Sequence, residues 1–330
     1  MKDRRAQLGF LGAFAAADLG RNDRLDRIDD VAKWYRFEKL LKKLAPEGPG
    51  RPPYEPLVMF KALLLANLYS LSDAALEEQL KDRISFRRFV GLPLDAAMPD
   101  HTTLCRFRNR LVEGGLLEKL FAEFNRQLEN NGLILKRGTV IDATLIECAS
   151  ARPRRTDDDD DDDDAEAGPG GDPDARFAKR AGKPGSVYGY KAHIATDQDS
   201  QLIRKAEMTA ANVNDTVVAD RLICFDERAV YADKAYSTRK RRALLKAARI
   251  KDRIMHKSWG GGPALTRWQQ LRNKLITPIR SRVETTFAIF KRHMGFRRGR
   301  YVGLAKNQAH LFLVALAYNL RRASVLATNA

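Results

Sequence analysis

Acidic residues in well-separated parts of the chain have types and surroundings suited to metal-dependent chemistry. Asp142 interrupts the β-branched and aliphatic run Val140–Ile146, which is typical of a buried strand. A carboxylate inside such a strand is costly unless it is paired or binds a metal. Asp233 follows a second short apolar run, Ala229–Ala232, and ligand sites in open α/β sheets gather at the carboxyl ends of strands. Taken alone, each Asp is about as consistent with a turn or cap as with catalysis.

A third acid, Glu284, lies in the segment Ile279–His293, whose pattern predicts a helix. On such a helix Arg280, Glu284 and Lys291 fall within about 40° of one another, and an adjacent apolar stripe gives the helix a side to pack on. In isolation the Arg280–Glu284 spacing favours an ordinary surface ion pair. The alternative is a metal-binding carboxylate between two cations that hold phosphate. Only the upstream acids decide between these interpretations.

Together the three pieces form an ordered pattern: D-A-T at Asp142, V-Y-A-D at Asp233, and R-x3-E-x6-K from Arg280 to Lys291. This pattern resembles the DDE transposases of bacterial insertion sequences, and most closely the IS-five group. The resemblance covers roughly residues 30–325 and includes the segments DHTTLCRFRNRL (100–111), YGYKAHIATD (188–197) and ANVNDTVVAD (211–220). One position departs from the family signature, which has Tyr three residues before the Arg, where this chain has Thr277.

The resemblance implies an α/β fold, with a ribonuclease-H-like mixed-sheet catalytic domain after an N-terminal all-helical DNA-binding domain. It implies that Asp142, Asp233 and Glu284 are catalytic and hold two Mg²⁺ ions, for which Mn²⁺ substitutes. Arg280 and Lys291 are then expected to hold DNA phosphates near the cleaved end. The expected partner is double-stranded DNA, both the transposon ends and the target, bound by a homodimer. The expected location is the bacterial cytoplasm, on the nucleoid when bound to DNA.

Two other functions stay open from the sequence. A ribonuclease-H-like nuclease would use the same three acids and cut DNA without joining it. A non-catalytic repressor descended from a transposase would bind DNA with a steep salt dependence and show no metal-dependent cleavage. The presence of all three acids in order favours the transposase.

The composition supports a nucleic-acid partner. The chain has 330 residues and a formal net charge of +17, although the run Asp157–Asp164 contributes eight negative charges. Such an excess favours a polyanion over the alternative of an inert basic protein. The three cysteines are far apart and have no zinc-binding spacing, so we expect reduced thiols. No uninterrupted run of about 18 apolar residues is present, so we expect no membrane span.

We expect three regions along the chain. Residues 1–29 form a docking segment, and residues 30–131 form a helix-turn-helix-like domain in which Arg106 and Arg110 are candidate DNA contacts. A solvated basic face is equally consistent with those two arginines. Residues 132–330 form the catalytic domain, interrupted at about 150–186 by an acidic insertion whose composition predicts disorder. We expect a hairpin from 187–196 and 201–209, and a closing helix over 304–326 packed on the sheet.

Three residues beside these motifs have weaker signals. His193 is a candidate for the site, although a structural role is the simpler interpretation. Trp259 and Trp268 are candidates for stacking on bases, and core or rim packing is the more common use of such side chains.

Overall fold

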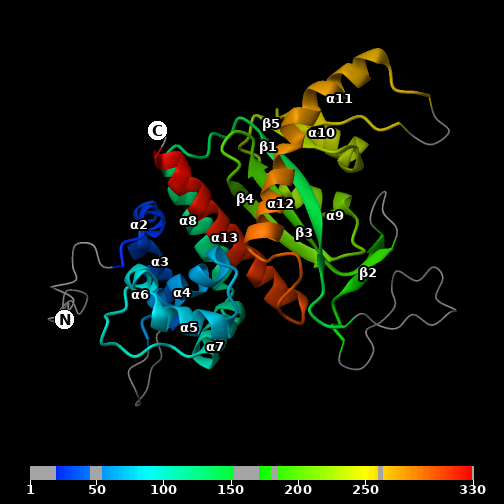
Figure 1. Ribbon diagram of the computed structural model, residues 1–330. Helices are drawn as coiled ribbons and strands as arrows, with labels where there is room; N and C mark the ends of the chain where they lie inside the picture. The colour runs from blue at the N-terminus through cyan, green and yellow to red at the C-terminus, as the bar shows by residue number, and fades with distance from the viewer. Residues whose placement is uncertain (1–19, 45–53, 152–170, 180–184, 259–262, 329–330) are drawn as a thin grey trace. The chain divides into compact units, whose positions relative to one another are not determined.

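A computed structural model describes residues 20–44, 54–151, 171–179, 185–258 and 263–328 (Figure 1). The acidic run Asp157–Asp164, Trp259 and most of the expected docking segment lie outside these residues. The chain divides into two compact units. The first comprises Met1–Asn130 with Phe312–Ala330, and the second comprises Asn131–Leu311.

In the described part of residues 20–130, every regular element is helical. The α-helices are α2 (Asp23–Asp30), α3 (Trp34–Leu41), α4 (Pro56–Leu68), α5 (Asp73–Asp82), α6 (Ile84–Val90), α7 (His101–Glu113) and α8 (Leu116–Asn130), and the 3₁₀ helix η2 is Lys42–Leu44. Helix α4 is buried along almost its whole length because it is apolar on every side. The side chains of Ser72 and Asp100 cap α5 and α7, which fixes where these helices begin.

The last helix, α13 (Leu304–Thr328), begins in the second unit and ends in the first. The sequence predicts that its apolar residues pack on the sheet, within a catalytic domain of 132–330, whereas the structure groups the residues from Phe312 onwards with the helical unit. The physical reason is a set of partners on α8. Phe312 packs on Phe121 with 5.6 Å between ring centroids, and the buried Asn319 amide donates to Asn125 at 3.1 Å.

The second unit is built on a six-stranded mixed sheet. Its strands are β1 (Thr139–Glu147), β2 (Arg176–Lys179), β3 (Ser186–Asp197), β4 (Ile203–Ala210), β5 (Ala229–Ala232) and β6 (Lys251–Ile254). The order is β2-β3-β1-β5-β6, and β4 also pairs with β3. The pairs β1–β3, β2–β3 and β3–β4 are antiparallel, whereas β5 runs parallel to both β1 and β6. The predicted hairpin is therefore present as β3 and β4.

Helices cover both faces of this sheet. They are α9 (Asp215–Leu222), η3 (Lys234–Tyr236), α10 (Arg239–Ala247), α11 (Arg267–Arg280) and α12 (Arg282–His293). Ile141 packs in a buried cluster with Val218 of α9, while Thr144 contacts Lys291 of α12. Since side chains alternate along a strand, α9 and α12 lie on opposite faces of β1 (Figure 1).

Part of the predicted disordered insertion, at about 150–186, is ordered. Residues 171–179 fold onto the sheet, with β2 pairing along Ser186–Gly189 of β3. Asp172 is fully buried, and its Oδ2 accepts hydrogen bonds from the Tyr190 hydroxyl at 2.6 Å and from the Gly303 amide at 3.0 Å. These distant partners order a segment whose Gly, Pro and Asp content suggests an unstructured loop.

One helix is long and apolar enough to cross a membrane by length and composition. It is α13, and 61% of its apolar window is buried inside the protein, as in the core helix of a soluble protein. The pair α4 and α5 passes the same test only as one span bent by 106°.

Candidate catalytic site

Asp142 lies in the middle of β1, on the face that α12 covers. Its side chain is 14% exposed, and its Oδ1 accepts a hydrogen bond from the Ala143 amide at 2.9 Å. Burial raises the pKa of this carboxyl group to about 6, while the nearby positive charge of Arg280 acts in the opposite direction. A bound cation would stabilise the charged form of a carboxyl group whose pKa is raised by burial.

Asp233 directly follows β5, the parallel neighbour of β1. Val140 of β1 is paired with Tyr231 of β5, so the register continued by two residues sets Asp233 beside Asp142. The negative charge of Asp233 contributes to the raised pKa of Asp142, which is consistent with this proximity. Asp233 also caps the 3₁₀ helix η3, because its Oδ1 accepts the Lys234 amide at 2.6 Å. The expected cap role and the expected site position thus coincide in one residue.

Arg280 joins the third acid to the first. Its Nη1 donates to Glu284 Oε1 at 2.7 Å, and its Nη2 donates to Asp142 Oδ2 at 3.1 Å. Glu284 is 59% exposed at the start of α12. The sequence correctly predicts an Arg280–Glu284 pair, and the fold brings Asp142 to the same guanidinium.

The predicted continuous helix Ile279–His293 is wrong. The structure has α11 ending at Arg280 and α12 beginning at Arg282, with Ser281 between them. Pro278, which lacks an N–H donor, stands inside the last turn of α11. Ser281 keeps right-handed helical angles (φ −68°, ψ −15°), which is why Arg280 and Glu284 still meet across the break.

Lys291 lies over the same face of β1 as Asp142. Its Nζ lies 2.6 Å from Thr144 Oγ1, and Thr144 is two residues along the strand from Asp142. Residues two apart on a strand point to the same side of the sheet. The structure therefore brings together Asp142, Glu284, Arg280 and Lys291, with Asp233 directly after the neighbouring strand.

The other two predicted DNA contacts lie in the helical unit. Arg106 of α7 is exposed, and Arg110 donates through Nη2 to the Leu44 carbonyl. Between them Arg108 is buried and holds both carboxylate oxygens of Asp73, at 2.8 and 2.6 Å. The three arginines of α7 thus have different surroundings, and Arg106 is the one with an exposed side chain.

Sequence reasoning missed Tyr236. This residue is 1% exposed, and its hydroxyl has no hydrogen-bond partner among the described residues. Burial, and then the negative charges of Asp142 and Asp215, raise the pKa of Tyr236. Its position three residues after Asp233, within η3, is the sequence signal that could have pointed to it.

His193 has the structural role that the sequence favoured. It is fully buried, its Nε2 lies 3.0 Å from Thr209 Oγ1, and burial lowers its pKa to about 4. It is paired with Ala143 of β1, so it points to the face opposite Asp142.

The donor set at this site fits divalent cations. Asp142, Asp233 and Glu284 offer only hard carboxylate oxygens, which are the ligands that Mg²⁺ and Mn²⁺ prefer.

Among the described residues, three candidate ligand atoms within 4.8 Å of one another occur at Cys224, Asp226 and Glu227. That group is an ion-pair cluster, because Arg204 pairs with Asp226 and Glu227 and Lys136 pairs with Asp226. At the candidate site itself, the guanidinium group of Arg280 lies between the carboxylates of Asp142 and Glu284 and donates a hydrogen bond to each.

Comparison with known families agrees with this arrangement. The family described as Transposase DDE domain matches residues 134–320, and the family described as Transposase domain (DUF772) matches residues 15–110. The mixed sheet and the helices around it lie within the range that matches the Transposase DDE domain. The chain belongs to the DDE transposase family, whose members generally use divalent metal ions.

A solved structure is also similar. It is the cryo-EM structure of the piggyBac transposase synaptic complex with hairpin DNA, at 11% sequence identity and a TM-score of 0.44. The similarity covers 98% of this chain and 77% of that chain.

Proposed function

We propose that this chain is a transposase of the IS-five group that binds the terminal inverted repeats of its own insertion sequence and catalyses DNA strand cleavage and strand transfer. The observation that carries the proposal is the convergence on one face of β1. Asp142 and Glu284 share the guanidinium of Arg280, and Asp233 follows the strand paired beside Asp142.

The proposal includes a ribonuclease-H-like fold for residues 131–311. Its support is the strand order β4-β3-β1-β5-β6, in which three antiparallel strands are followed by two strands parallel to β1. In this arrangement one acid lies on the central strand and the second lies after the adjacent parallel strand. The third comes from a helix near the end of the domain.

In the proposed chemistry Asp142, Asp233 and Glu284 would hold two divalent ions, which would supply activation of the attacking oxygen and stabilisation of the departing one. Magnesium is the expected ion, and manganese is expected to replace it. Arg280 and Lys291 bind the phosphates beside the cleaved bond.

In the proposed order of reaction, water attacks the phosphorus at the transposon end and breaks its P–O3′ bond, which leaves a 3′-hydroxyl and a 5′-phosphate. That 3′-hydroxyl then attacks a phosphorus of the target strand, forms a new P–O3′ bond and releases the 3′-hydroxyl of the target. No protein nucleophile is required. The helical unit is proposed to bind DNA through Arg106, and the protein is proposed to act as a homodimer on DNA in the bacterial cytoplasm.

The test is an incubation of the protein with DNA carrying the inverted repeats that flank its own gene, in Mg²⁺ and in Mn²⁺, beside Asp142→Asn. Nicks at the repeat ends followed by joined products, both absent in the variant, support the transposase. Nicks without joined products indicate a nuclease instead. Specific binding without cleavage in either metal indicates a DNA-binding repressor.

A further inference from the structure

Helix α11 carries its apolar residues on the outside. Trp268, Leu271 and Leu275 are 65%, 56% and 68% exposed, and Leu275 and Trp268 are the most exposed large hydrophobic residues in the described part of the chain. Their spacing of three and then four residues sets them within about 60° of one another on the helix. We call these three residues the α11 stripe. Of the two packing roles expected for Trp268, core or rim, the structure shows the rim, since its ring centroid lies 5.8 Å from that of His256.

The orientation of α11 is fixed by its polar side. Arg272 donates to the Ile254 and Asp252 carbonyls, at 2.8 and 2.5 Å, and Asn273 exchanges two hydrogen bonds with the backbone of His256. Ile276 is the buried residue of the helix. Rotation of α11 to bury the stripe would break these bonds along β6 and the residues after it. The stripe therefore faces away from the sheet because the opposite side is anchored.

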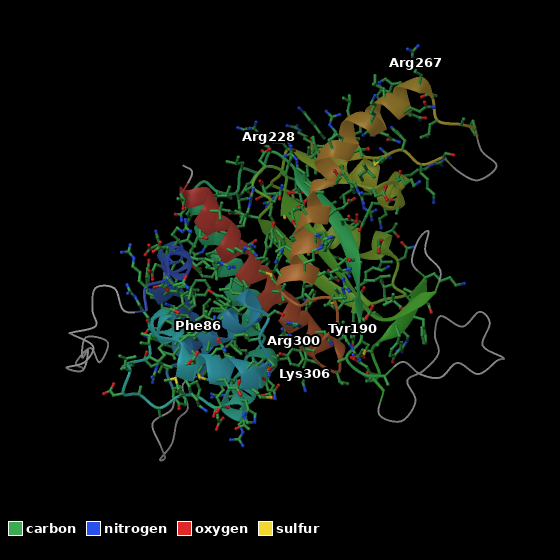
Figure 2. All side chains as sticks on the ribbon, in the orientation of Figure 1. Phe86, Tyr190, Arg228, Arg267, Arg300 and Lys306 are labelled. Carbon is green, nitrogen blue, oxygen red and sulfur yellow. The ribbon has the colours of Figure 1, made fainter. Side chains whose placement is uncertain are left out.

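The charge beside the stripe is entirely positive. The sequence of α11, RWQQLRNKLITPIR, contains no acidic residue, and the exposed Arg267 and Lys274 flank the stripe. Arg267 lies at the outer end of the helix, away from the sheet (Figure 2). Helix α10 adds further exposed cations and meets α11 at Asp252, which pairs with both Arg242 and Arg272. Such a surface fits a polyanion that also offers apolar surface.

The helix leads directly out of the catalytic site. Arg280, its last residue, bonds Asp142 and Glu284, and Trp268 lies twelve residues earlier in the same helix. At 1.5 Å per residue this is roughly 18 Å, or about five base-pair steps of 3.4 Å. Along the helix axis the stripe is thus close enough for DNA with its cleaved phosphate at the acids to reach it, while around the axis Arg280 extends from the anchored side and the stripe from the opposite side.

We propose that the α11 stripe is a DNA-contacting surface, which binds the bases and sugars of the duplex beside the cleaved phosphate while Arg267 and Lys274 contact phosphates. This rests on the proposed function, since it needs DNA at the acids. Apolar side chains contact DNA by packing on thymine methyl groups, by wedging between base steps and by stacking on bases.

A second copy of the chain fits the stripe less well. Pairing of α11 with its own copy would bring the cations of both helices together without any acidic partner on either helix. Three side chains also bury far less than the roughly 1,200 Å² that a stable protein interface needs. Charge and area therefore both favour DNA.

The experiment measures binding in EDTA, so that cleavage plays no part. The probe is a fluorescein-labelled duplex carrying the inverted repeat, and the variants are Trp268→Ala and the double change Leu271→Ser with Leu275→Ser. The matched control is Val217→Ser with Phe225→Ser, since these residues of the same unit are 58% and 52% exposed. We expect roughly tenfold weaker binding for Trp268→Ala, from the usual loss on removing a stacked aromatic, weaker binding also for the leucine pair through lost apolar contact, and no change for the control.

A second measurement reports the contact directly. Trp268 is the remaining tryptophan when Trp34 and Trp259 are replaced by Phe, and its emission should be quenched as duplex is added. Normal affinity of the stripe variants with unchanged emission overturns the inference and leaves the transposase proposal intact. A change of oligomeric state in the stripe variants, with normal DNA affinity, overturns it in favour of a second copy. Failure of the wild-type protein to bind duplex removes both proposals.

Discussion

The guanidinium Nη2 of Arg280 lies 3.1 Å from Oδ2 of Asp142, although 138 residues separate them in the chain. This contact only partly offsets the cost of burying the carboxylate, since the pKa of Asp142 is still raised to about 6. The difference from the ordinary value of 3.8 corresponds to about 3 kcal/mol against the charged form. The site therefore holds a negative charge that the fold alone does not fully stabilise.

The first prediction concerns stability and pH. Because the folded-state pKa of Asp142 lies above its unfolded value, the protein loses stability as the pH rises from about 4 through 6, and the loss is constant above that range. Asp142→Asn removes this loss and keeps an acceptor oxygen for Arg280. We expect the variant to be more stable than wild type by about 2–3 kcal/mol at pH 8 and equal to it near pH 4. Urea unfolding at both pH values measures this.

Asp226 provides a control with the opposite sign. Its pKa is lowered by hydrogen bonds and charges from Lys136 and Arg204, which outweigh burial. Asp226→Asn should therefore destabilise the protein at pH 8, with an effect that shrinks as the pH falls below about 4. If Asp142→Asn destabilises the protein equally at pH 8 and pH 4, Arg280 compensates the buried charge fully and the interpretation of the site is wrong.

The second prediction concerns the role of Arg280 in catalysis. Arg280→Ala removes both the bridge to Glu284 and the positive charge that lowers the pKa of Asp142. We expect DNA cleavage to fall by at least about 100-fold, the usual effect of losing a charge that stabilises the transition state. The acid limb of the pH–rate profile should also move to higher pH, because the Asp142 carboxyl then binds its proton more tightly.

Arg282→Ala is the matched control, since Arg282 bonds the Gln198 carbonyl and lies outside the group of acids. Arg280→Lys should recover little activity, because an ammonium group lacks the planar fork that reaches both carboxylates. An unshifted pH profile in Arg280→Ala would show that the charge of Arg280 does not act on Asp142.

Local patterns were sufficient to predict the strands that carry the site. The β-branched run around Asp142 and the short apolar run before Asp233 form strands with nearly the predicted bounds. The second is buried throughout, and the first is buried except at residues 142–145, which are partly exposed, and at Glu147 at its end. The break at Ser281 was not predictable from the Arg280–Glu284 spacing, because helical angles at Ser281 preserve that spacing on both sides of the break.

Tertiary partners account for what the sequence did not reveal. Asp172 is ordered by Tyr190 and Gly303, which are distant in the chain, and its own neighbours suggest a loop. Leu275 is an apolar residue that the pattern would place inside, yet the anchoring of Asn273 to His256 turns it outward. Such arrangements depend on contacts that a linear pattern does not encode.

The third prediction concerns the anchor at Asp172. Its carboxylate accepts hydrogen bonds from the Tyr190 hydroxyl and the Gly303 amide, so Asp172→Ala leaves buried donors without partners. We expect a loss of about 2–4 kcal/mol in the free energy of unfolding. Asp174→Ala removes only a carboxylate that accepts the Leu304 amide at the start of α13, so a loss of about 1 kcal/mol is expected. Equal effects in urea unfolding would contradict the anchor.

The last prediction separates two arginines of α7 that are two residues apart. Arg108 is buried and bonds both oxygens of Asp73, so Arg108→Ala leaves an unpaired carboxylate and should cost about 3–5 kcal/mol of stability. Arg106 is exposed, so Arg106→Ala should leave the free energy of unfolding within about 0.5 kcal/mol of wild type.

If Arg106 contacts a DNA phosphate, its loss should weaken binding to all duplexes alike. The slope of log K against log salt should then fall by about one. Urea unfolding and DNA titrations at several salt concentrations measure the two effects separately. An unchanged salt slope in Arg106→Ala would assign the DNA contacts of the helical unit to other residues.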